Sequence, residues 1–274
     1  MKHRSLSLFA TYFWLFVFGL IPLILIFICA FLTRDEQSLV ALPFTIQAFA
    51  DLFNPLYLKV FYRSLYIAFL TTGLCLMLAF PFSYIMVRSR HQSILLLLII
   101  IPFWTSSLVR TYSLIAVLKS KGLINALLLK LHLIDQPLSL LFTNFAVICG
   151  LVYNLFPFMV LPLFTNMERF DFRLIEAAQD LGANRWQIFW KVFVPGNANG
   201  ILAGCILVSL PAMTLFYIPN VLGGARSILI GNLIQDQFLM TQNWPQGAAT
   251  SVILTALLLL LLTIFRKQSR GVVQ

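Results

Sequence analysis

The stretch EAAQDLGANRWQIFWKVFVPG, residues 176–196, decides how the rest of the chain is interpreted. It lies in the most highly charged segment of an otherwise apolar sequence. Asp171 can cap a first short helix, Gly182 can take the left-handed conformation that ends it, and Asn184 can cap a second helix. Pro195 is expected to stop that second helix, because proline has no N–H to donate. The pattern predicts two short helices joined by a tight turn.

The first of these helices carries an apolar stripe that includes two small side chains. Small residues allow another backbone to approach closely, so we expect the stripe to be a docking face. It consists of four residues at helical spacing: Leu174, Ala177, Ala178 and Leu181.

The same stretch resembles the EAA loop of the permease subunits of bacterial ABC importers. The family pattern is E-A-A, three residues, G, nine residues and I-x-L-P, and this chain departs from it only by valine for isoleucine and for leucine. In that family the loop is a cytoplasmic coupling helix that sits in a cleft of an ATP-hydrolysing subunit. A merely solvated loop between two spans is the alternative interpretation. The resemblance implies a coupling role for Glu176, Ala177, Ala178, Asp180, Gly182 and Pro195.

The composition is that of a polytopic membrane protein. Of 274 residues, 60% are hydrophobic and 10% are charged, whereas about a quarter are charged in soluble domains. The net charge of +10 does not indicate nucleic-acid binding, because the basic residues are dispersed at the ends of apolar runs. The four cysteines lie in separate apolar runs and His132 stands alone, so no metal site is expected.

Six apolar runs are long enough to cross a bilayer core of about 30 Å. The first is too long for a cleaved signal peptide, and residues 123–134 are too short to span, so we expect them to form an interfacial helix on the outer side. The sequence predicts an all-α polytopic membrane protein, and the resemblance implies the type I ABC importer permease fold. We expect a single domain over residues 1–274, with spans at about 8–32, 65–87, 93–110, 143–165, 200–218 and 246–265 and a cytoplasmic coupling loop at 166–199.

The basic residues predict which side of the membrane each loop faces. The two termini, with Lys2 and Arg4 at one end, and the loop after the second run carry basic charges without acidic ones. This favours two cytoplasmic termini and a cytoplasmic helix pair in a bacterial inner membrane. Lys121 and Arg226 are then expected on the outside.

The sequence contains no recognisable catalytic motif. It lacks H-E-x-x-H, G-x-S-x-G and a glycine-rich phosphate loop, and the predicted spans carry charged residues only at their ends. An intramembrane enzyme and a passive channel are therefore the disfavoured alternatives. We expect a transport subunit with no cofactor of its own, and the resemblance implies that ATP and Mg bind to a partner ATPase.

Four further segments resemble the first permease subunit of the bacterial spermidine/putrescine importer. The resemblance implies that this chain forms half of a polyamine path, and a related importer of sulfate, iron or phosphonate is the alternative. It also implies three kinds of partner: a second homologous permease, two copies of an ATP-binding cassette ATPase and a periplasmic substrate-binding protein. The segments are FLTRDE at 31–36, PFWTSSLVR at 102–110, GLVYNLFPFMV at 150–160 and LPAMTLFY at 210–217.

Aromatic rings are the candidate substrate contacts. A polyamine that leaves water gains about 0.5 to 2 kcal/mol from each ring face it meets. Core packing or an interfacial belt is the alternative role for each ring. The candidates are Trp104, Tyr112, Phe216 and Tyr217, with Asp236 as the acid expected near the outer mouth and most other acids expected on the partner permease.

Overall fold

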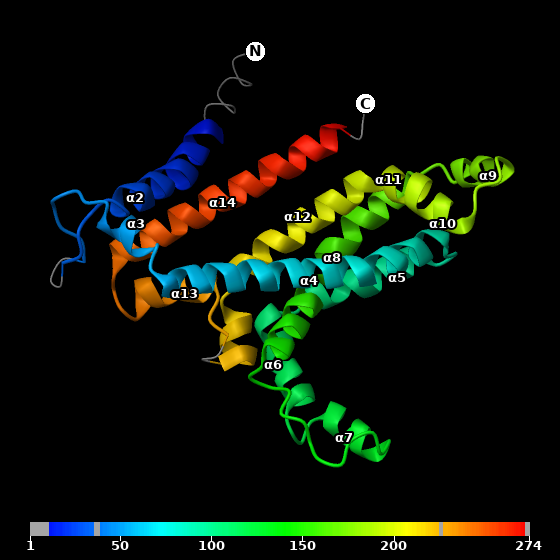
Figure 1. Ribbon diagram of the computed structural model, residues 1–274, viewed down its shortest axis with the longest axis horizontal. Helices are drawn as coiled ribbons and strands as arrows, with labels where there is room; N and C mark the ends of the chain where they lie inside the picture. Colours follow the sequence, from blue (N-terminus) through cyan, green and yellow to red (C-terminus); the bar gives the residue numbers. More distant parts are fainter. Residues whose placement is uncertain (1–10, 36–38, 225–226, 272–274) are drawn as a thin grey trace. The chain divides into compact units, whose positions relative to one another are not determined.

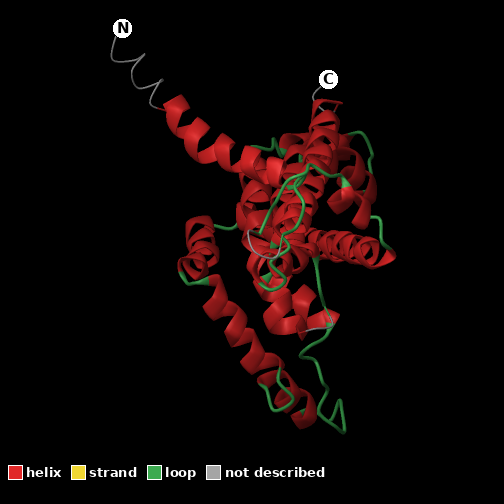
Figure 2. Cartoon of the chain, turned by 90° about the vertical axis from the view of Figure 1, so that its left-hand side faces the viewer, coloured by secondary structure: helices red, strands yellow, loops and turns green. Residues whose placement is uncertain are grey.

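The computed structural model describes residues 11–35, 39–224 and 227–271, with side chains as far as Thr263. Within these ranges the chain is helical and contains no strand (Figures 1 and 2). It divides into two compact units, residues 1–61 with 230–259 and residues 62–229 with 260–274. Lys2, Arg4 and Arg226 lie outside the described residues, as do the side chains of the basic residues near the carboxyl terminus, Arg266, Lys267 and Arg270.

The first unit combines the amino-terminal helix with two helices from the last part of the chain. Residues Thr11–Cys29 form a helix that includes a π turn η1 (Phe16–Leu20) and α2 (Ile21–Cys29). No residue of its apolar stretch is buried. The hydrophobic core of this unit consists of Ala30, Ala48, Leu52, Ala248 and Ala249. The remaining elements are α3 (Gln47–Asp51), the start of α4 (Pro55–Arg88), α13 (Ile230–Leu239) and most of α14 (Trp244–Gly271).

In the second unit, α4 and α8 (Asn144–Glu168) run in the same direction. The Cys75 thiol donates to the Val152 carbonyl at 3.9 Å, and the Ser83 hydroxyl donates to the Val160 carbonyl at 3.5 Å. The sequence offset is 77 residues in both pairs, which only parallel helices give. The chain between them must therefore return to the end of this unit from which α4 comes.

The returning segment, which includes the span expected over 93–110, is broken into several helices. It consists of α5 (Gln92–Ile100), the 3₁₀ turn η2 (Ile101–Trp104), α6 (Ser107–Leu118) and, after a turn, α7 (Leu123–Lys130). Thr105 is extended, with ψ of 146°, and its hydroxyl donates to the Pro102 carbonyl at 2.6 Å. Pro102 lacks an N–H and the hydroxyl competes for a helix carbonyl, which explains the break.

The helix pair follows α8 as α9 (Arg173–Asp180), α10 (Arg185–Ile188), the π turn η3 (Phe189–Phe193) and α11 (Val194–Gly196). The helix ends at Gly196, one residue beyond Pro195, and the wider turn of η3 just before the proline accommodates its ring. The chain then bends by 66° between Gly196 and α12 (Ala198–Thr214). After α12, Leu215 is extended and η4 (Pro219–Gly223) follows, so the helix expected over 200–218 ends early.

Close packing of α12 on α8 depends on two glycines one helical turn apart. A Cβ on Gly200 would lie 2.7 Å from the Asn166 Cβ and 3.0 Å from the Pro162 carbonyl oxygen. A Cβ on Gly204 would lie 2.5 Å from the Met159 sulfur. The spacing is the small-residue pattern that lets membrane helices approach closely.

The described residues contain five helices long and apolar enough to cross a membrane, or six if the bent pair is one span. Their outward faces are apolar, as a lipid environment requires. This confirms the predicted class of all-α polytopic membrane protein. The helical segments are Thr11–Cys29, Pro55–Arg88, Ser107–Lys130 (α6 and α7 with the turn between them), Asn144–Glu168, Trp244–Thr263 and the bent pair Arg185–Gly196 with Ala198–Thr214.

Candidate coupling surface and translocation residues

The turn between α9 and α10 has the local structure that its sequence predicts. Gly182 has a φ of +81°, which is the left-handed region. Asn184 accepts from the Gln187 N–H at 2.8 Å, while the Gln187 side chain accepts from the Asn184 N–H at 2.9 Å. Asp171 accepts from the Arg173 N–H at 3.0 Å, although Phe172 holds the cap position itself. The turn is therefore specified by residues next to one another in the chain.

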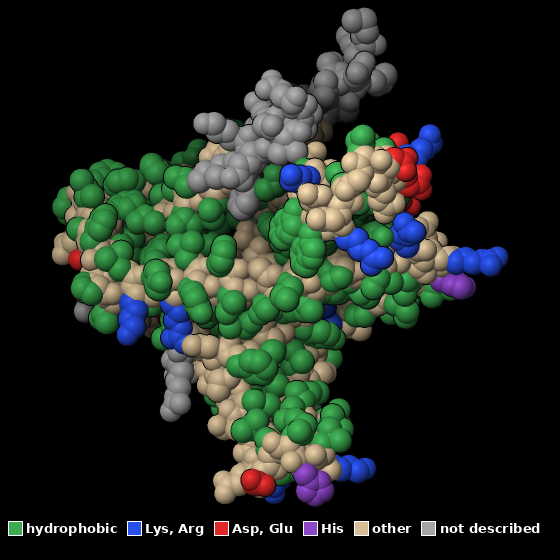
Figure 3. Space-filling model, turned by 45° about the vertical axis from the view of Figure 1, so that its right-hand side comes forward, with side chains coloured by type: hydrophobic (Ala, Val, Ile, Leu, Met, Phe, Trp, Pro, Cys, Tyr) green, Lys and Arg blue, Asp and Glu red, His purple; other side chains and the backbone are tan. Residues whose placement is uncertain are grey.

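The docking stripe on α9 is open to its surroundings. Leu181 is 88% exposed and Leu174 is 52% exposed, and Ala177 is exposed beside them while Ala178 is half-buried. Glu176 and Asp180 are also exposed. Charged side chains of both signs gather around α9 and α10, whereas hydrophobic side chains cover much of the remaining visible surface (Figure 3). An apolar stripe with a charged border is typical of a surface that another protein covers.

An aromatic cluster anchors the helix pair to α4, and sequence reasoning missed it. Phe193 of η3 is 5% exposed, and its ring centroid lies 5.5 Å from that of Phe80 and 5.3 Å from that of Tyr84. Phe170 packs on the same ring at 5.4 Å. The guanidinium of Arg88 lies 5.5 Å from the Phe172 ring, which places the end of α4 beside the start of the pair. The loop after α4 and the helix pair are thus at the same end of this unit.

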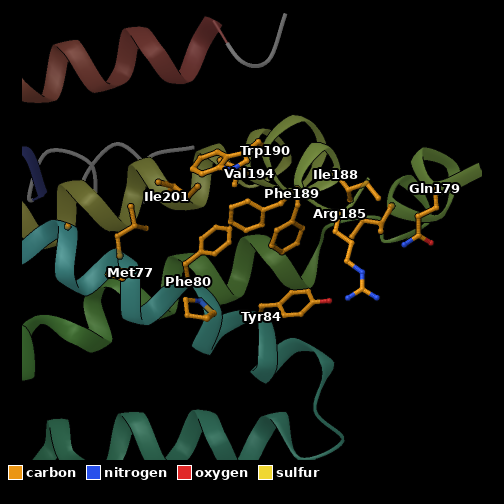
Figure 4. A pocket seen from close by; sticks show the side chains of 15 residues that line it. Met77, Phe80, Tyr84, Gln179, Arg185, Ile188, Phe189, Trp190, Val194 and Ile201 are labelled. Carbon is orange, nitrogen blue, oxygen red and sulfur yellow. The ribbon is translucent and has the colours of Figure 1, made fainter. Parts of the chain in front are cut away.

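A cavity of about 1070 Å³ lies between α4, the helix pair and the start of α12. Figure 4 shows rings of Phe80, Phe189 and Tyr84 around it, with Arg185 and Gln179 toward α9. Its lining is mostly apolar. The helix pair therefore packs on α4 through aromatic rings on one side of this cavity. The pair is not buried on all sides.

The four aromatic candidates lie in the second unit, in two pairs. Trp104 is 83% exposed just before the break at Thr105, and Tyr112 is exposed on α6 beyond it. The rings of Phe216 and Tyr217 are 6.4 Å apart, between α12 and η4. Asp236 belongs to α13 in the other unit, where its backbone carbonyl accepts from the Met240 and Thr241 N–H groups at 2.9 Å.

Two arginines in this unit have polar or aromatic surroundings that the sequence did not reveal. Arg63 of α4 donates to the Asn144 side chain and, at 3.4 Å, to the Ser227 hydroxyl, and thereby ties α4 to the start of α8. Arg110 of α6 lies against the rings of Phe103 and Tyr153. For each of these arginines the sequence shows only a basic residue within or next to an apolar run. We interpreted such residues as marking the membrane boundary.

Metal-binding and redox chemistry find no support in the described part of the chain. No group of three or more His, Cys, Asp or Glu side chains lies close enough there to hold a metal ion. The four cysteines are free. The expectation that this chain carries no cofactor stays a prediction.

Comparison with known proteins gives concordant results. The family described as binding-protein-dependent transport system inner membrane component matches residues 71–272. The chain is 42% identical to the spermidine/putrescine transport system permease protein PotB of Haemophilus influenzae, covering 98% of this chain and 95% of the relative. It is 46% identical to the protein of the same name from Escherichia coli, covering 94% of each. A bacterial alginate ABC transporter, solved in complex with an alginate-bound periplasmic protein, contains a chain of the same fold, with a TM-score of 0.80, 15% identity and coverage of 99% and 95%.

Proposed function

Because the chain belongs to the family of binding-protein-dependent transport system inner membrane components, we propose that it is a polyamine permease of an ATP-driven importer. The observation that carries the proposal is the similarity to spermidine/putrescine permeases over nearly the whole length of both chains. The protein is a multi-pass inner-membrane transport subunit. Its function is to provide a path across the membrane and to change that path in response to a partner.

Partners supply what this chain does not have. We infer that a second homologous permease forms the other half of the path and that a periplasmic polyamine-binding protein delivers the substrate. Two copies of an ATPase would bind ATP and Mg and contact the α9 surface. The exposed stripe with Leu174 and Leu181 supports that contact, because such a surface is costly to leave in water.

The aromatic cluster suggests how ATP hydrolysis would reach the path. A movement imposed on α9 would pass through Phe193 to Phe80 and Tyr84 on α4, and through the 66° bend to α12. Both α4 and α12 pack on or run beside α8. Contiguous packed rings transmit displacement because protein cores deform little. Glu176, Ala177, Ala178, Asp180, Gly182 and Pro195 then act by holding the pair in the shape that the ATPase recognises.

Uptake of labelled spermidine by cells lacking this chain tests the proposed substrate. Expression of the chain should restore uptake, and unlabelled putrescine should compete with the label. Restored uptake of sulfate, iron or phosphonate without spermidine uptake would instead support a related importer. Uptake that persists after ATP depletion would support a passive channel.

The proposed orientation places both termini and Arg185 in the cytoplasm and Lys121 outside. A membrane-impermeant thiol reagent applied to intact cells should label Lys121→Cys and spare Arg185→Cys, in a background without the four native cysteines. Both positions are exposed, so accessibility to the reagent should depend on the side of the membrane. The opposite labelling pattern would invert the topology and remove the α9 surface from the ATPase.

We propose that Trp104 contacts the polyamine, with Tyr112, Phe216, Tyr217 and Asp236 as further candidates along the path. Trp104→Ala should reduce the rate of polyamine uptake about three- to thirtyfold, because one cation–π contact is lost. Trp104→Phe keeps a ring and should retain most of the rate. Complex assembly and basal ATP hydrolysis are the controls. Equal uptake by Trp104→Ala and the parent would exclude Trp104 from the path, and lost assembly would assign it to packing.

A further inference from the structure

We propose that Phe103 and Tyr153 form a cation site in the translocation path and that the guanidinium of Arg110 occupies this site while substrate is absent. The inference rests on the proposed polyamine function and adds to it a residue that limits how long substrate is held. Arg110 would act as a tethered competitor of the substrate ammonium group.

The site is assembled from three elements of the second unit. The Arg110 guanidinium carbon, on α6, lies 5.2 Å from the centre of the Phe103 ring on η2 and 5.9 Å from the centre of the Tyr153 ring on α8. Phe158 holds the Phe103 ring edge to face at 5.0 Å. The break at Thr105 brings Phe103 and Arg110 onto the same side of this segment. Two ring faces therefore converge on one cation, within the distance at which rings attract cations.

The polar surroundings of Arg110 do not hold it strongly. Its Nε is buried without a hydrogen-bond partner, and no carboxylate of the described residues pairs with it. The neighbouring residue of Tyr153, Asn154, is 3% exposed and its Oδ1 is likewise buried without a partner. A half-buried cation without a carboxylate is retained less firmly than an ion pair. Arg110 can thus leave the rings more easily than a salt-bridged arginine could.

A substrate cation can reach the same rings from outside. Tyr153 is 46% exposed, and the two proposed path residues on either side of the break, Trp104 and Tyr112, are more exposed still. An ammonium group binds the same aromatic faces as a guanidinium. Both cannot occupy them together, because like charges repel. Arg110 therefore weakens retention of the polyamine and favours its onward release.

Binding of labelled spermidine to the purified full transporter in nanodiscs, measured with parallel uptake by cells, tests this role. Arg110→Met keeps the length of the side chain without its charge, and it should tighten spermidine binding about three- to thirtyfold while the maximal uptake rate falls. Arg110→Lys keeps a cation and should resemble the parent. Adding Tyr153→Leu to Arg110→Met removes a ring face and should abolish the gain in affinity.

The outcomes separate this inference from the proposed function. Spermidine binding by Arg110→Met that is equal to or weaker than binding by the parent, in an assembled complex, would overturn the inference alone. A gain in affinity that survives the addition of Tyr153→Leu would overturn it as well. A parent transporter that neither binds nor transports spermidine would overturn the proposed function itself.

Discussion

Gly182→Leu is expected to reduce polyamine uptake by tenfold or more while the chain still inserts and its helices still fold. Gly182 has a φ of +81°, and a residue with a branched side chain pays about 1–2 kcal/mol in that region. A Cβ at this position meets nothing within 4 Å, so the expected defect comes from the backbone of the turn and from the space left for the ATPase. The measurements are uptake by cells and substrate-stimulated ATP hydrolysis by the purified transporter.

Gly182→Asn is the matched control, because asparagine adopts the left-handed conformation more readily than leucine. It should keep more of the uptake than Gly182→Leu. If Gly182→Leu retained the ATPase subunits and full substrate-stimulated hydrolysis, α9 and its turn would not be the coupling surface.

Gly200→Leu should have the second large effect, the loss of assembled transporter. The backbone oxygen of Pro162 would lie 3.0 Å from the new Cβ and cannot move aside as a flexible side chain can. Helices α8 and α12 must then separate, at a cost of about 1–3 kcal/mol or more. We expect the amount of intact complex, measured by size-exclusion chromatography of the solubilised transporter, to fall severalfold.

Gly73→Leu provides the comparison on the same chain. Gly73 lies within α4, and a Cβ there meets nothing within 4 Å. This variant should assemble like the parent. Equal yields of Gly200→Leu and the parent would show that α8 and α12 are not packed through this glycine.

Features determined by neighbouring residues were predictable from the sequence. The left-handed Gly182 and the helix cap by Asn184 need only a few consecutive residues, and the structure confirms both. The apolar runs also became helices, because length and hydropathy are local properties. The span expected at 65–87 starts later than helix α4, which begins at Pro55, because the first turns of α4 carry Lys59 and Arg63 and are therefore less apolar than the rest of the helix.

Other features depend on the choice between competing local interactions or on tertiary contacts. The break at Thr105 arises where a hydroxyl bonds the Pro102 carbonyl, and hydropathy does not detect such a bond. The end of the helix at Gly196 rather than at Pro195 itself depends on the wider turn of η3. The rings around Phe193 and around Arg110 come from distant segments, so no spacing along the chain revealed them. The substrate was predicted from resemblance, because a net charge of +10 does not itself indicate a cationic substrate.

The most direct test of ATP-driven polyamine import uses this chain reconstituted with its partner permease and ATPase in proteoliposomes, with the binding protein and labelled spermidine supplied on the side of the membrane opposite the ATPase. We predict that spermidine accumulates on the ATPase side only when ATP and Mg are present there, and that Gly182→Leu lowers this accumulation tenfold or more. Accumulation without ATP, or ATP-dependent accumulation that Gly182→Leu leaves unchanged, would contradict the account.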